Sequence, residues 1–306
     1  DPITESQVRA WGLTCHGKDT FPAIGEFSPE ALRTALGLAQ PASAPGGVIG
    51  VPARPPGLCA GCPHIGSYHG LRGDDARVTG DIGCYTLAAL KPLAAMDTCV
   101  SMGSSIGNAV GMSLSRAERK PIVATIGDST FLHGGIPALI DAVYNQANIT
   151  VLLLDNRTVA MTGGQDHPGT GKTLRGDKTH KVDYEAICRA AGVSWIKRID
   201  SYDLAVGHQT LREAMEYDGV AVVISDRPCV LDPVKIKGTP FRVRAEACTA
   251  CQSCMNLGCP AITWSDELFE GRHKVQIDQS LCIGCSMCVQ VCPTDGLACG
   301  AIEAGA

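Results

Sequence analysis

The strongest pattern in the chain is an alternation of short apolar runs with segments of helical periodicity. Three runs consist almost wholly of apolar or β-branched residues, as expected for strands buried on both faces of a sheet. They are Ile122–Ile126, Ile149–Leu154 and Val220–Ile224. The helical patterns cover Ser105–Arg116, Ile136–Gln146, Tyr184–Ala191 and Tyr202–Tyr217. This order predicts an α/β domain with a largely parallel sheet, which binds ligands at the carboxyl ends of its strands.

Outside this region the pattern changes, which divides the chain into three parts. Residues 1–47 contain one helical pattern, Pro29–Leu38, and a linker from Pro41 to Gly47, so we expect the end of a preceding domain. Residues 48–238 form the α/β domain, and residues 239–306 form a compact domain of short segments. The chain begins at Asp1 rather than Met, and we therefore expect a piece of a longer protein.

Composition limits the class of protein. Of the 306 residues, 45% are hydrophobic and 19% are charged, and no apolar run reaches the ~18 residues that cross a bilayer. The net charge of −5 argues against a nucleic-acid partner. The chain has sixteen cysteines and no apparent secretory signal, which favours metal thiolates in a reducing cytoplasm. We expect a cytoplasmic protein with neither a membrane nor a nucleic-acid partner.

The cysteines of the last part form two runs. They read Cys248-x2-Cys251-x2-Cys254-x4-Cys259-Pro and Cys282-x2-Cys285-x2-Cys288-x3-Cys292-Pro. The second has the ligand spacing of a [4Fe–4S] cluster, and the first has one extra residue before its fourth cysteine. In two-cluster ferredoxins this fourth cysteine ligates the other cluster. We therefore predict an α+β ferredoxin-like domain with one cluster on Cys248, Cys251, Cys254 and Cys292, and another on Cys282, Cys285, Cys288 and Cys259.

Zinc and disulfides are the alternatives for these cysteines. Zinc sites usually combine one CxxC pair with a distant pair or with histidines, so two successive CxxCxxC runs favour iron–sulfur clusters. From residue 240 onward, seven acidic residues outnumber four basic ones. An acidic surface around electron-carrying clusters would face an electron acceptor.

Polar residues at two strand ends predict a magnesium and diphosphate site. Gly127-Asp128-Ser129 follows one apolar run, and Asp155-Asn156 follows the next. The Asp128 carboxylate, the Asn156 amide and a carbonyl just after it are oxygen ligands that suit Mg²⁺. The alternative, an aspartate that only caps a helix, is commoner for an isolated Gly-Asp pair. The order of these residues resembles the signature of thiamine diphosphate enzymes.

Two glycine-rich segments have competing interpretations. Met102-Gly-Ser-Ser-Ile-Gly-Asn108 opens a helix, and its free amides are either a second diphosphate contact or part of a capped, closely packed helix. Asp166-His-Pro-Gly-Thr-Gly-Lys-Thr173 nearly spells a P-loop, but it has Asp where Gly is required and no helical pattern after it. We therefore do not predict ATP hydrolysis.

A larger set of motifs follows in order along the chain. These motifs are Leu58-Cys-x-Gly-Cys-Pro-His64, Gly80-Asp-Ile-Gly-Cys84, Met102-Gly-Ser-Ser-Ile-Gly107, Ile126-Gly-Asp-Ser129, Asp155-Asn-x-Thr-x-Ala-Met-Thr-Gly-Gly-Gln165-x-His-Pro168 and Arg227-Pro-Cys229. Together they resemble the 2-oxoacid:ferredoxin oxidoreductases, and specifically the C-terminal half of the large subunit of indolepyruvate ferredoxin oxidoreductases. The resemblance covers residues 50 to 300. Many relatives have Pro and Gly where this chain has Ala60 and Ser129, and neither change removes a ligand.

The resemblance implies three [4Fe–4S] clusters, thiamine diphosphate and Mg²⁺. The additional, proximal cluster would be held by Cys59, Cys62, Cys84 and Cys229. Magnesium would be bound by Asp128, Asn156 and the Thr158 carbonyl, with His64 nearby as a catalytic candidate. The residues implied to contact thiamine diphosphate are Gly103, Ser104, Ser105, Ile106, Gly127, Asp128, Ser129, Asn156, Met161, Thr162, Gly163 and Gln165. Cys15, Cys99, Cys188 and Cys299 are interpreted as ordinary thiols.

The implied activity is the oxidative decarboxylation of an aryl 2-oxoacid to an acyl-CoA, with electrons passed to ferredoxin. The same chemistry on phenylglyoxylate or pyruvate is one alternative, and an electron-transfer module without catalysis is another. The activating glutamate is expected outside this chain. Expected partners are the N-terminal half of the same subunit, a smaller subunit, ferredoxin, coenzyme A and the 2-oxoacid.

Overall fold

A computed structural model describes residues 2–41, 55–115, 120–232, 238–293 and 300–305. It divides into two compact units, Asp1–Pro55 and Pro56–Ala306. The smaller unit contains α1 (Pro2–Ala10) and α2 (Pro29–Ala35), the second of which is capped by the Ser28 hydroxyl. The predicted linker after Pro41, the boundary at residue 48, Arg116 and Cys299 lie outside the described residues.

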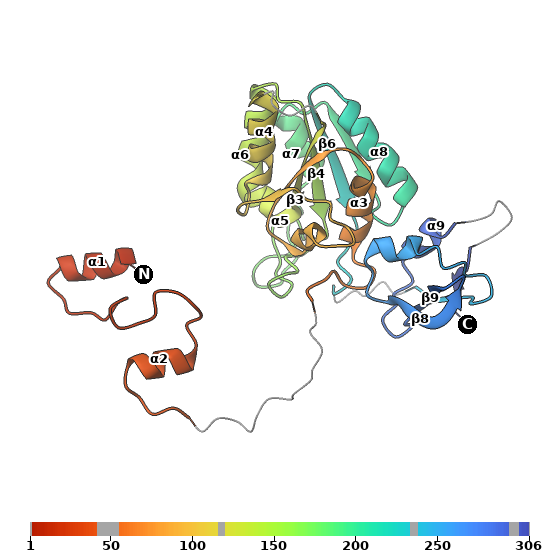
Figure 1. The fold of residues 1–306 in the computed structure, drawn as a ribbon. Helices are drawn as coiled ribbons and strands as arrows, with labels where there is room; N and C mark the ends of the chain where they lie inside the picture. Colours follow the sequence, from red (N-terminus) through yellow and green to blue (C-terminus); the bar gives the residue numbers. More distant parts are fainter. Residues whose placement is uncertain (1, 42–54, 116–119, 233–237, 294–299, 306) are drawn as a thin grey trace. The chain divides into compact units, whose positions relative to one another are not determined.

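The α/β part of the larger unit is built on a six-stranded parallel sheet (Figure 1). The strand order is β2-β1-β3-β4-β6-β5. The bounds are β1 Arg77–Gly80, β2 Thr98–Cys99, β3 Ile122–Gly127, β4 Ile149–Asp155, β5 Trp195–Ile199 and β6 Val220–Asp226. The three predicted strands are the central β3, β4 and β6, whereas β1, β2 and β5 were not predicted.

Helices cover both faces of the sheet. The elements are α3 Pro63–Arg72, η1 Cys84–Ala89, α4 Ser105–Ser115, α5 Asp128–Thr130, η2 Phe131–Gly135, α6 Ile136–Tyr144, α7 Tyr184–Ala190 and α8 Leu204–Glu216. Helices α4, α6 and α7 lie on one face, and α3 and α8 lie on the other (Figure 1). The four predicted helices correspond to α4, α6, α7 and α8. Helix α8 starts two residues later than predicted, because the Asp203 side chain accepts the Val206 amide and caps it there.

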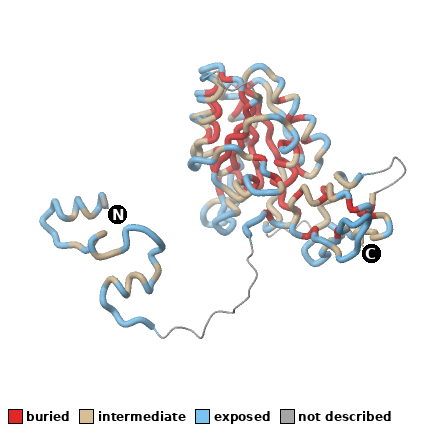
Figure 2. The backbone as a smooth tube through the Cα atoms, viewed as in Figure 1, coloured by how far each residue is buried: buried red, intermediate tan, exposed pale blue. Residues whose placement is uncertain are grey.

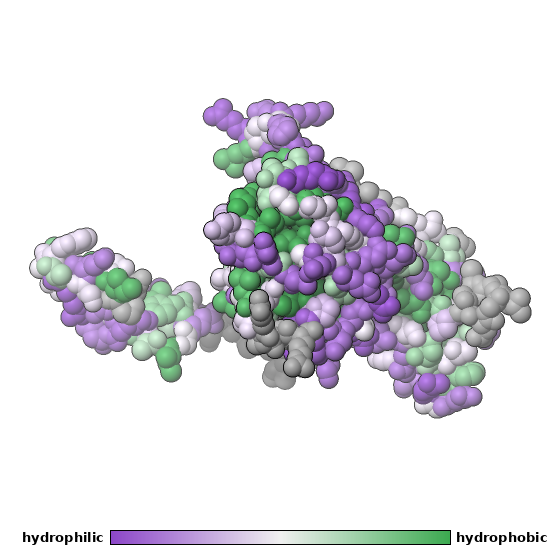
Figure 3. Space-filling view, turned by 90° about the horizontal axis from the view of Figure 1, so that it is seen from above, coloured by the Kyte–Doolittle hydropathy of each residue, from purple (hydrophilic) through white to green (hydrophobic). Residues whose placement is uncertain are grey.

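Alternate residues of each central strand belong to different cores. In β4, Leu152 and Leu154 pack toward α3 and α8, while Val151 and Leu153 pack toward α4 and α6. The buried segments therefore run through the middle of the unit (Figure 2). In Figure 3, hydrophobic side chains gather near the centre of the visible face of this unit, with hydrophilic ones around them. Burial on both faces explains why these strands read as continuous apolar runs.

The cysteine-rich part shares the core on the α3 side. Its elements are β7 Phe241–Val243, η3 Ser253–Leu257, β8 Ile262–Phe269, β9 Arg272–Ile277, α9 Met287–Val291 and β10 Ile302–Ala304. Strands β8 and β9 form an antiparallel hairpin, and β7 pairs antiparallel with β10. Leu257 and Met287 belong to the same buried cluster as Ile65 of α3. In the described parts of the chain, no helix has the length and apolar character needed to span a membrane.

Candidate active site and cysteine clusters

The predicted magnesium ligands meet at the carboxyl ends of β3 and β4. Asp128 begins α5 directly after β3, and Asn156 follows β4; both are buried. Strands β3 and β4 are hydrogen-bonded neighbours, which is why these two positions come together. Asp128 accepts the Ser129 amide at 2.8 Å and the Arg157 amide at 2.7 Å, so its carboxylate is oriented by the backbone.

The three oxygen donors fit a cation. The side-chain amide of Asn156 lies 2.7 Å from the Thr158 carbonyl oxygen and 3.3 Å from Asp128 Oδ2. If the side-chain nitrogen of Asn156 points toward these two atoms, it donates a hydrogen bond to each of them. If the side-chain oxygen points there instead, three hard oxygens face one another, as they do around Mg²⁺. The structure therefore brings together the carboxylate, amide and carbonyl that the sequence predicts as ligands.

A cavity of about 110 Å³ adjoins these groups. It is lined by Asp128, Asn156 and Thr158, by the predicted cofactor residues Gly127, Ser129, Met161 and Thr162, and by His64, Cys84 and Tyr85. Gly163 and Gln165 do not line it. Gln165 instead donates to the Thr162 carbonyl at 2.6 Å and pairs with Val159 across the loop, so it shapes the loop that carries Met161.

His64 projects into this cavity as a neutral imidazole. Burial lowers the pKa of His64 to about 4, and the nearby Asp128 carboxylate opposes this only in part. The ring packs edge-on against Tyr85, with 5.6 Å between the ring centroids. The Tyr85 hydroxyl accepts the Gly127 amide at 3.1 Å and donates to the Ile82 carbonyl, which ties His64 to the end of β3.

The amides of residues 103–105, at the start of α4, have hydrogen-bond partners within the chain. Buried Asp81 accepts the Gly103 amide at 2.8 and 2.9 Å and the Ser105 amide at 3.3 Å. The Ser104 amide donates to the Ser101 carbonyl, and Ile106 is buried in the core. Asp81 thus caps the helix, in agreement with the alternative interpretation of a capped helix. Contact of Gly103, Ser104, Ser105 and Ile106 with the cofactor stays a prediction.

A buried polar group behind Asp128 was not predicted. His167 Nδ1 accepts the Gly169 amide at 3.2 Å, and His167 Nε2 lies 3.3 Å from Asp128 Oδ2. Burial, followed by the negative charges of Asp128 and Asp226, raises the pKa of the neighbouring Asp155 to about 6. The motif contained His167, but its contact with Asp128 depends on the fold of the whole loop. The P-loop-like segment around it is followed by turns and not by a helix.

The four scattered cysteines lie near one another. Cys62 is the N-cap residue of α3, Cys84 begins η1, and the Cys229 amide donates to the Asn156 carbonyl at 2.9 Å. Burial raises the pKa of the Cys62 thiol, and the charges of Cys59, Cys229 and Cys84 raise it further. Burial and then Cys229 and Cys59 likewise raise the pKa of Cys84. Cys84 also lines the cavity of Asp128, which puts this cysteine group beside the candidate magnesium site.

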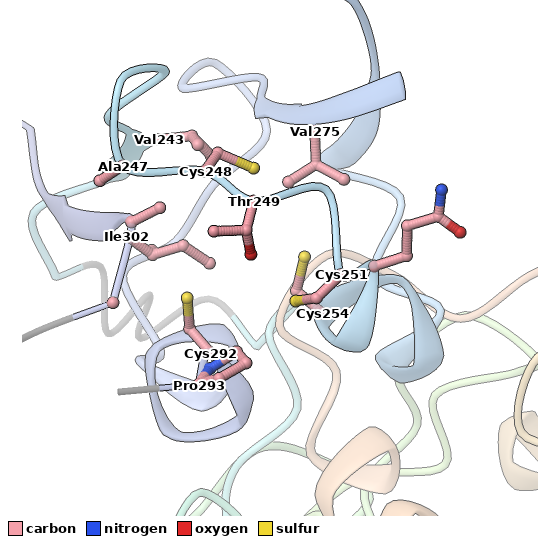
Figure 4. A pocket seen from close by; sticks show the side chains of 13 residues that line it. Val243, Ala247, Cys248, Thr249, Cys251, Cys254, Val275, Cys292, Pro293 and Ile302 are labelled. Atoms are coloured by element: carbon pink, nitrogen blue, oxygen red, sulfur yellow. The ribbon is translucent and has the colours of Figure 1, made fainter. Parts of the chain in front are cut away.

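The eight cysteines of the last part divide between two cavities. A cavity of about 350 Å³ is lined by Cys248, Cys251, Cys254 and Cys292, whose side chains surround a common space (Figure 4). A second cavity, of about 20 Å³, is lined by Cys259, Cys282, Cys285 and Cys288. In each cavity, three cysteines come from one run and the fourth comes from the other. This is the exchange predicted from the spacing.

Each cavity contains a buried thiol whose pKa is raised, so that this thiol binds metal only with loss of a proton. Burial, followed by the charge of Cys292, raises the pKa of Cys254 to about 12, and burial raises that of Cys285 to about 11. Because iron binds thiolate, occupation of these cavities would release protons. Within the described residues, no three Cys, His, Asp or Glu side chains form a site for a single metal ion.

Comparison with known families defines the class. The C-terminal TPP binding domain of thiamine pyrophosphate enzymes matches residues 81–225, and the 4Fe-4S binding domain matches residues 275–297. The fold resembles a 2-oxoglutarate:ferredoxin oxidoreductase from Magnetococcus marinus, with a TM-score of 0.51 and 19% identity over 57% of this chain and 65% of that chain. A thiamine diphosphate-binding domain is thus joined to an iron–sulfur domain.

Curated relatives narrow the family. Indolepyruvate oxidoreductase subunit IorA of Methanothermobacter marburgensis is 42% identical over 97% of this chain and 50% of its own length. IorA of Thermococcus kodakarensis is 38% identical over 96% of this chain and 51% of its own length. The 2-oxoglutarate synthase subunit KorB of Archaeoglobus fulgidus is 26% identical over 54% of this chain and 66% of its own length. The chain belongs to the 2-oxoacid:ferredoxin oxidoreductase family, and it spans about half the length of the indolepyruvate oxidoreductase subunits that it matches.

Proposed function

We propose that this chain is the thiamine diphosphate- and cluster-binding part of an enzyme that oxidatively decarboxylates an aryl 2-oxoacid of the indolepyruvate type. The products would be carbon dioxide and an acyl-CoA, with electrons delivered to ferredoxin. The observation that carries the proposal is the meeting of the Asp128, Asn156 and Thr158 oxygens in a cavity that also contains Cys84. The similarity to indolepyruvate oxidoreductase subunits supports the substrate class.

Residues of this chain would bind the metal ion and contact the cofactor. Asp128, Asn156 and the Thr158 carbonyl would hold Mg²⁺ against a diphosphate, while Met161 and Thr162 would cover the cofactor from the loop after β4. The neutral His64 could donate or accept a hydrogen bond without adding charge. Thiamine diphosphate supplies an electron sink that makes decarboxylation of a 2-oxoacid feasible. Two electrons must then leave singly, which is the role we assign to the cysteine-bound clusters.

The cavities suggest an order for these clusters. The cavity of Cys259, Cys282, Cys285 and Cys288 is also lined by Ala60 and Gly61, which lie between Cys59 and Cys62. The cluster held by this set would therefore be the neighbour of the proximal cluster. The set around Cys248 would hold the outer cluster, because its cavity is lined by residues 243–302 and not by the loop of Cys59–Cys62. Ferredoxin would receive electrons there.

A decisive assay uses the full-length subunit with its partner subunit, both prepared without oxygen. Indolepyruvate, phenylglyoxylate and pyruvate would each be supplied with coenzyme A and oxidised ferredoxin. We expect acyl-CoA formation and ferredoxin reduction, fastest with indolepyruvate, and loss of both in Asp128→Ala. Asp218→Ala, in the exposed turn before β6, is the matched control and should behave as the unmodified enzyme. If no 2-oxoacid reduces ferredoxin, the proposal is wrong.

A further inference from the structure

Two cysteine loops of the same form face each other in the larger unit. One is Cys59-Ala-Gly-Cys62 and the other is Cys282-Ile-Gly-Cys285; their glycines have φ of +68° and +75°. A Cβ added at Gly61 would overlap the side chain of Ile283 and would lie 3.6 Å from Cys285 Cβ. The two loops are thus in direct contact, with no room for a side chain at Gly61.

Tyr202 connects these loops. Its hydroxyl donates to the Gly61 carbonyl at 2.6 Å. Its own carbonyl accepts the side-chain amide of Gln290 at 2.7 Å, and Gln290 Oε1 accepts the Leu204 amide at 3.0 Å. Gln290 lies on α9, the helix that also carries Cys288. Tyr202 is therefore bonded to the proximal cysteine loop at one end and to the cluster-binding helix at the other.

The position of the Tyr202 ring is fixed from a third side. The Arg227 guanidinium lies 4.3 Å from the centre of the ring and is held by Asp200, to which its Nε donates at 2.9 Å. Arg227 is two residues before Cys229. Burial raises the pKa of the Tyr202 phenol, and the Cys285 and Cys62 thiols are among the further causes. Residues from both cysteine groups thus surround this one side chain.

We propose that Tyr202 is a positioning residue that holds the loop of Cys59–Cys62 against the loop of Cys282–Cys285 and so sets the separation of two cluster sites. This inference rests on the proposed function, because it assumes that both cysteine sets hold clusters. One electron at a time passes between the two cluster sites, so that one site is oxidised and the other is reduced by one electron. No bond or proton changes at Tyr202, so its role is purely geometric.

The position of Tyr202 also affects how closely water approaches the neighbouring cluster site. An open cavity of about 500 Å³ borders the contact and is lined by Tyr202, Arg227, Ile283 and Cys285. Solvent exposure and hydrogen bonds shift the reduction potentials of iron–sulfur clusters. A smaller side chain at position 202 would widen this cavity beside Cys285. Tyr202→Ala should therefore raise the potential of the neighbouring cluster, whereas Tyr202→Phe should keep water out.

The test compares variants of the full-length subunit, purified without oxygen and reduced with dithionite. The signal is the magnetic splitting between neighbouring reduced clusters in electron paramagnetic resonance spectra. We expect Tyr202→Phe to decrease this splitting, because the hydrogen bond to Gly61 that holds the two loops together is removed and the two sites move apart. Gly61→Ala should abolish it, because the added methyl group forces Ile283 away. Gly61→Ala combined with Ile283→Ala should recover part of it.

A matched control separates backbone strain from the loop contact. Gly271 has φ of +76° and open space around it, so Gly271→Ala carries the strain without a clash and should leave the splitting intact. Iron content distinguishes the two proposals. Fewer than about twelve irons in the unmodified chain would contradict the proposed function, since three [4Fe–4S] clusters require that number. About twelve irons with an unchanged splitting in Tyr202→Phe would overturn the role of Tyr202, even if Gly61→Ala fails to fold.

Discussion

Cys62 and His64 lie at the start of helix α3, so the packing of this helix against the sheet should determine the positions of both side chains. Two glycines of this helix face α8 and the preceding turn, but their surroundings differ. A Cβ at Gly66 would lie 2.9 Å from the Ser201 carbonyl carbon and still closer to its oxygen. At Gly70 the nearest atom would be Leu211 Cδ1, the end of a flexible side chain, at 3.3 Å. We therefore predict opposite effects for Gly66→Ala and Gly70→Ala.

The change in the free energy of unfolding has two contributions. Replacing Gly with Ala within a helix stabilises it by about 1 kcal/mol. Overpacking costs roughly 1–3 kcal/mol, and the upper value applies to Gly66 because a backbone carbonyl must move. The net change in the free energy of unfolding is then a loss of about 2 kcal/mol for Gly66→Ala, and between zero and a gain of about 1 kcal/mol for Gly70→Ala. For a unit of this size, 2 kcal/mol lowers Tm by about 4–8 °C.

Thermal unfolding followed by circular dichroism, with iron analysis of the same samples, measures both consequences. Gly66→Ala should unfold at a lower temperature and hold less iron, because the start of α3 moves with the helix. Gly70→Ala, only one turn away, is the matched control and should equal or exceed the unmodified chain in both respects. If the two variants were equally stable, the contact of α3 with Ser201 would not position the site as we describe.

Two further predictions concern the cysteines. Cys292→Ser should remove the cluster from the cavity of Cys248, and Cys259→Ser should remove the cluster from the cavity of Cys282. If both variants lost the signal of the same cluster, each run would not supply the fourth ligand of the other run's cluster. Cys188 is fully buried and its burial raises its pKa to about 12, so it should resist iodoacetamide from pH 7 to 9, where it stays protonated. Exposed Cys99 should be labelled, and peptide mass spectra showing the reverse would refute this.

The sequence predicts those strands that are buried on both faces of the sheet. Strands β3, β4 and β6 are buried on both faces, so each appears as a continuous apolar run. Strand β5 lies at the sheet edge with Lys197 and Arg198 exposed, and β2 has only two residues, so neither gives such a run. Helix α3 is buried along almost its whole length and therefore shows no polar face. Its periodicity could not be recognised for that reason.

The candidate site was predictable only as far as its chemistry is local. The spacing of the two cysteine runs predicts the composition of both cysteine cavities, because three ligands of each lie on one short loop. The capping of α4 by Asp81 was missed, since Asp81 is some twenty residues away and reaches the helix through the pairing of β1 with its neighbours. The contacts of His167 and Tyr202 likewise depend on tertiary packing. Nothing in the residues beside them indicates these partners.

We propose that electrons leave a thiamine-dependent site through three clusters, one of them built from Cys59, Cys62, Cys84 and Cys229. The decisive measurement is the amount of iron and acid-labile sulfide per chain in the full-length subunit purified without oxygen. We expect about twelve of each, falling to about eight in Cys84→Ser, since each cluster contains four irons. About eight in the unmodified protein, unchanged by Cys84→Ser, would contradict it.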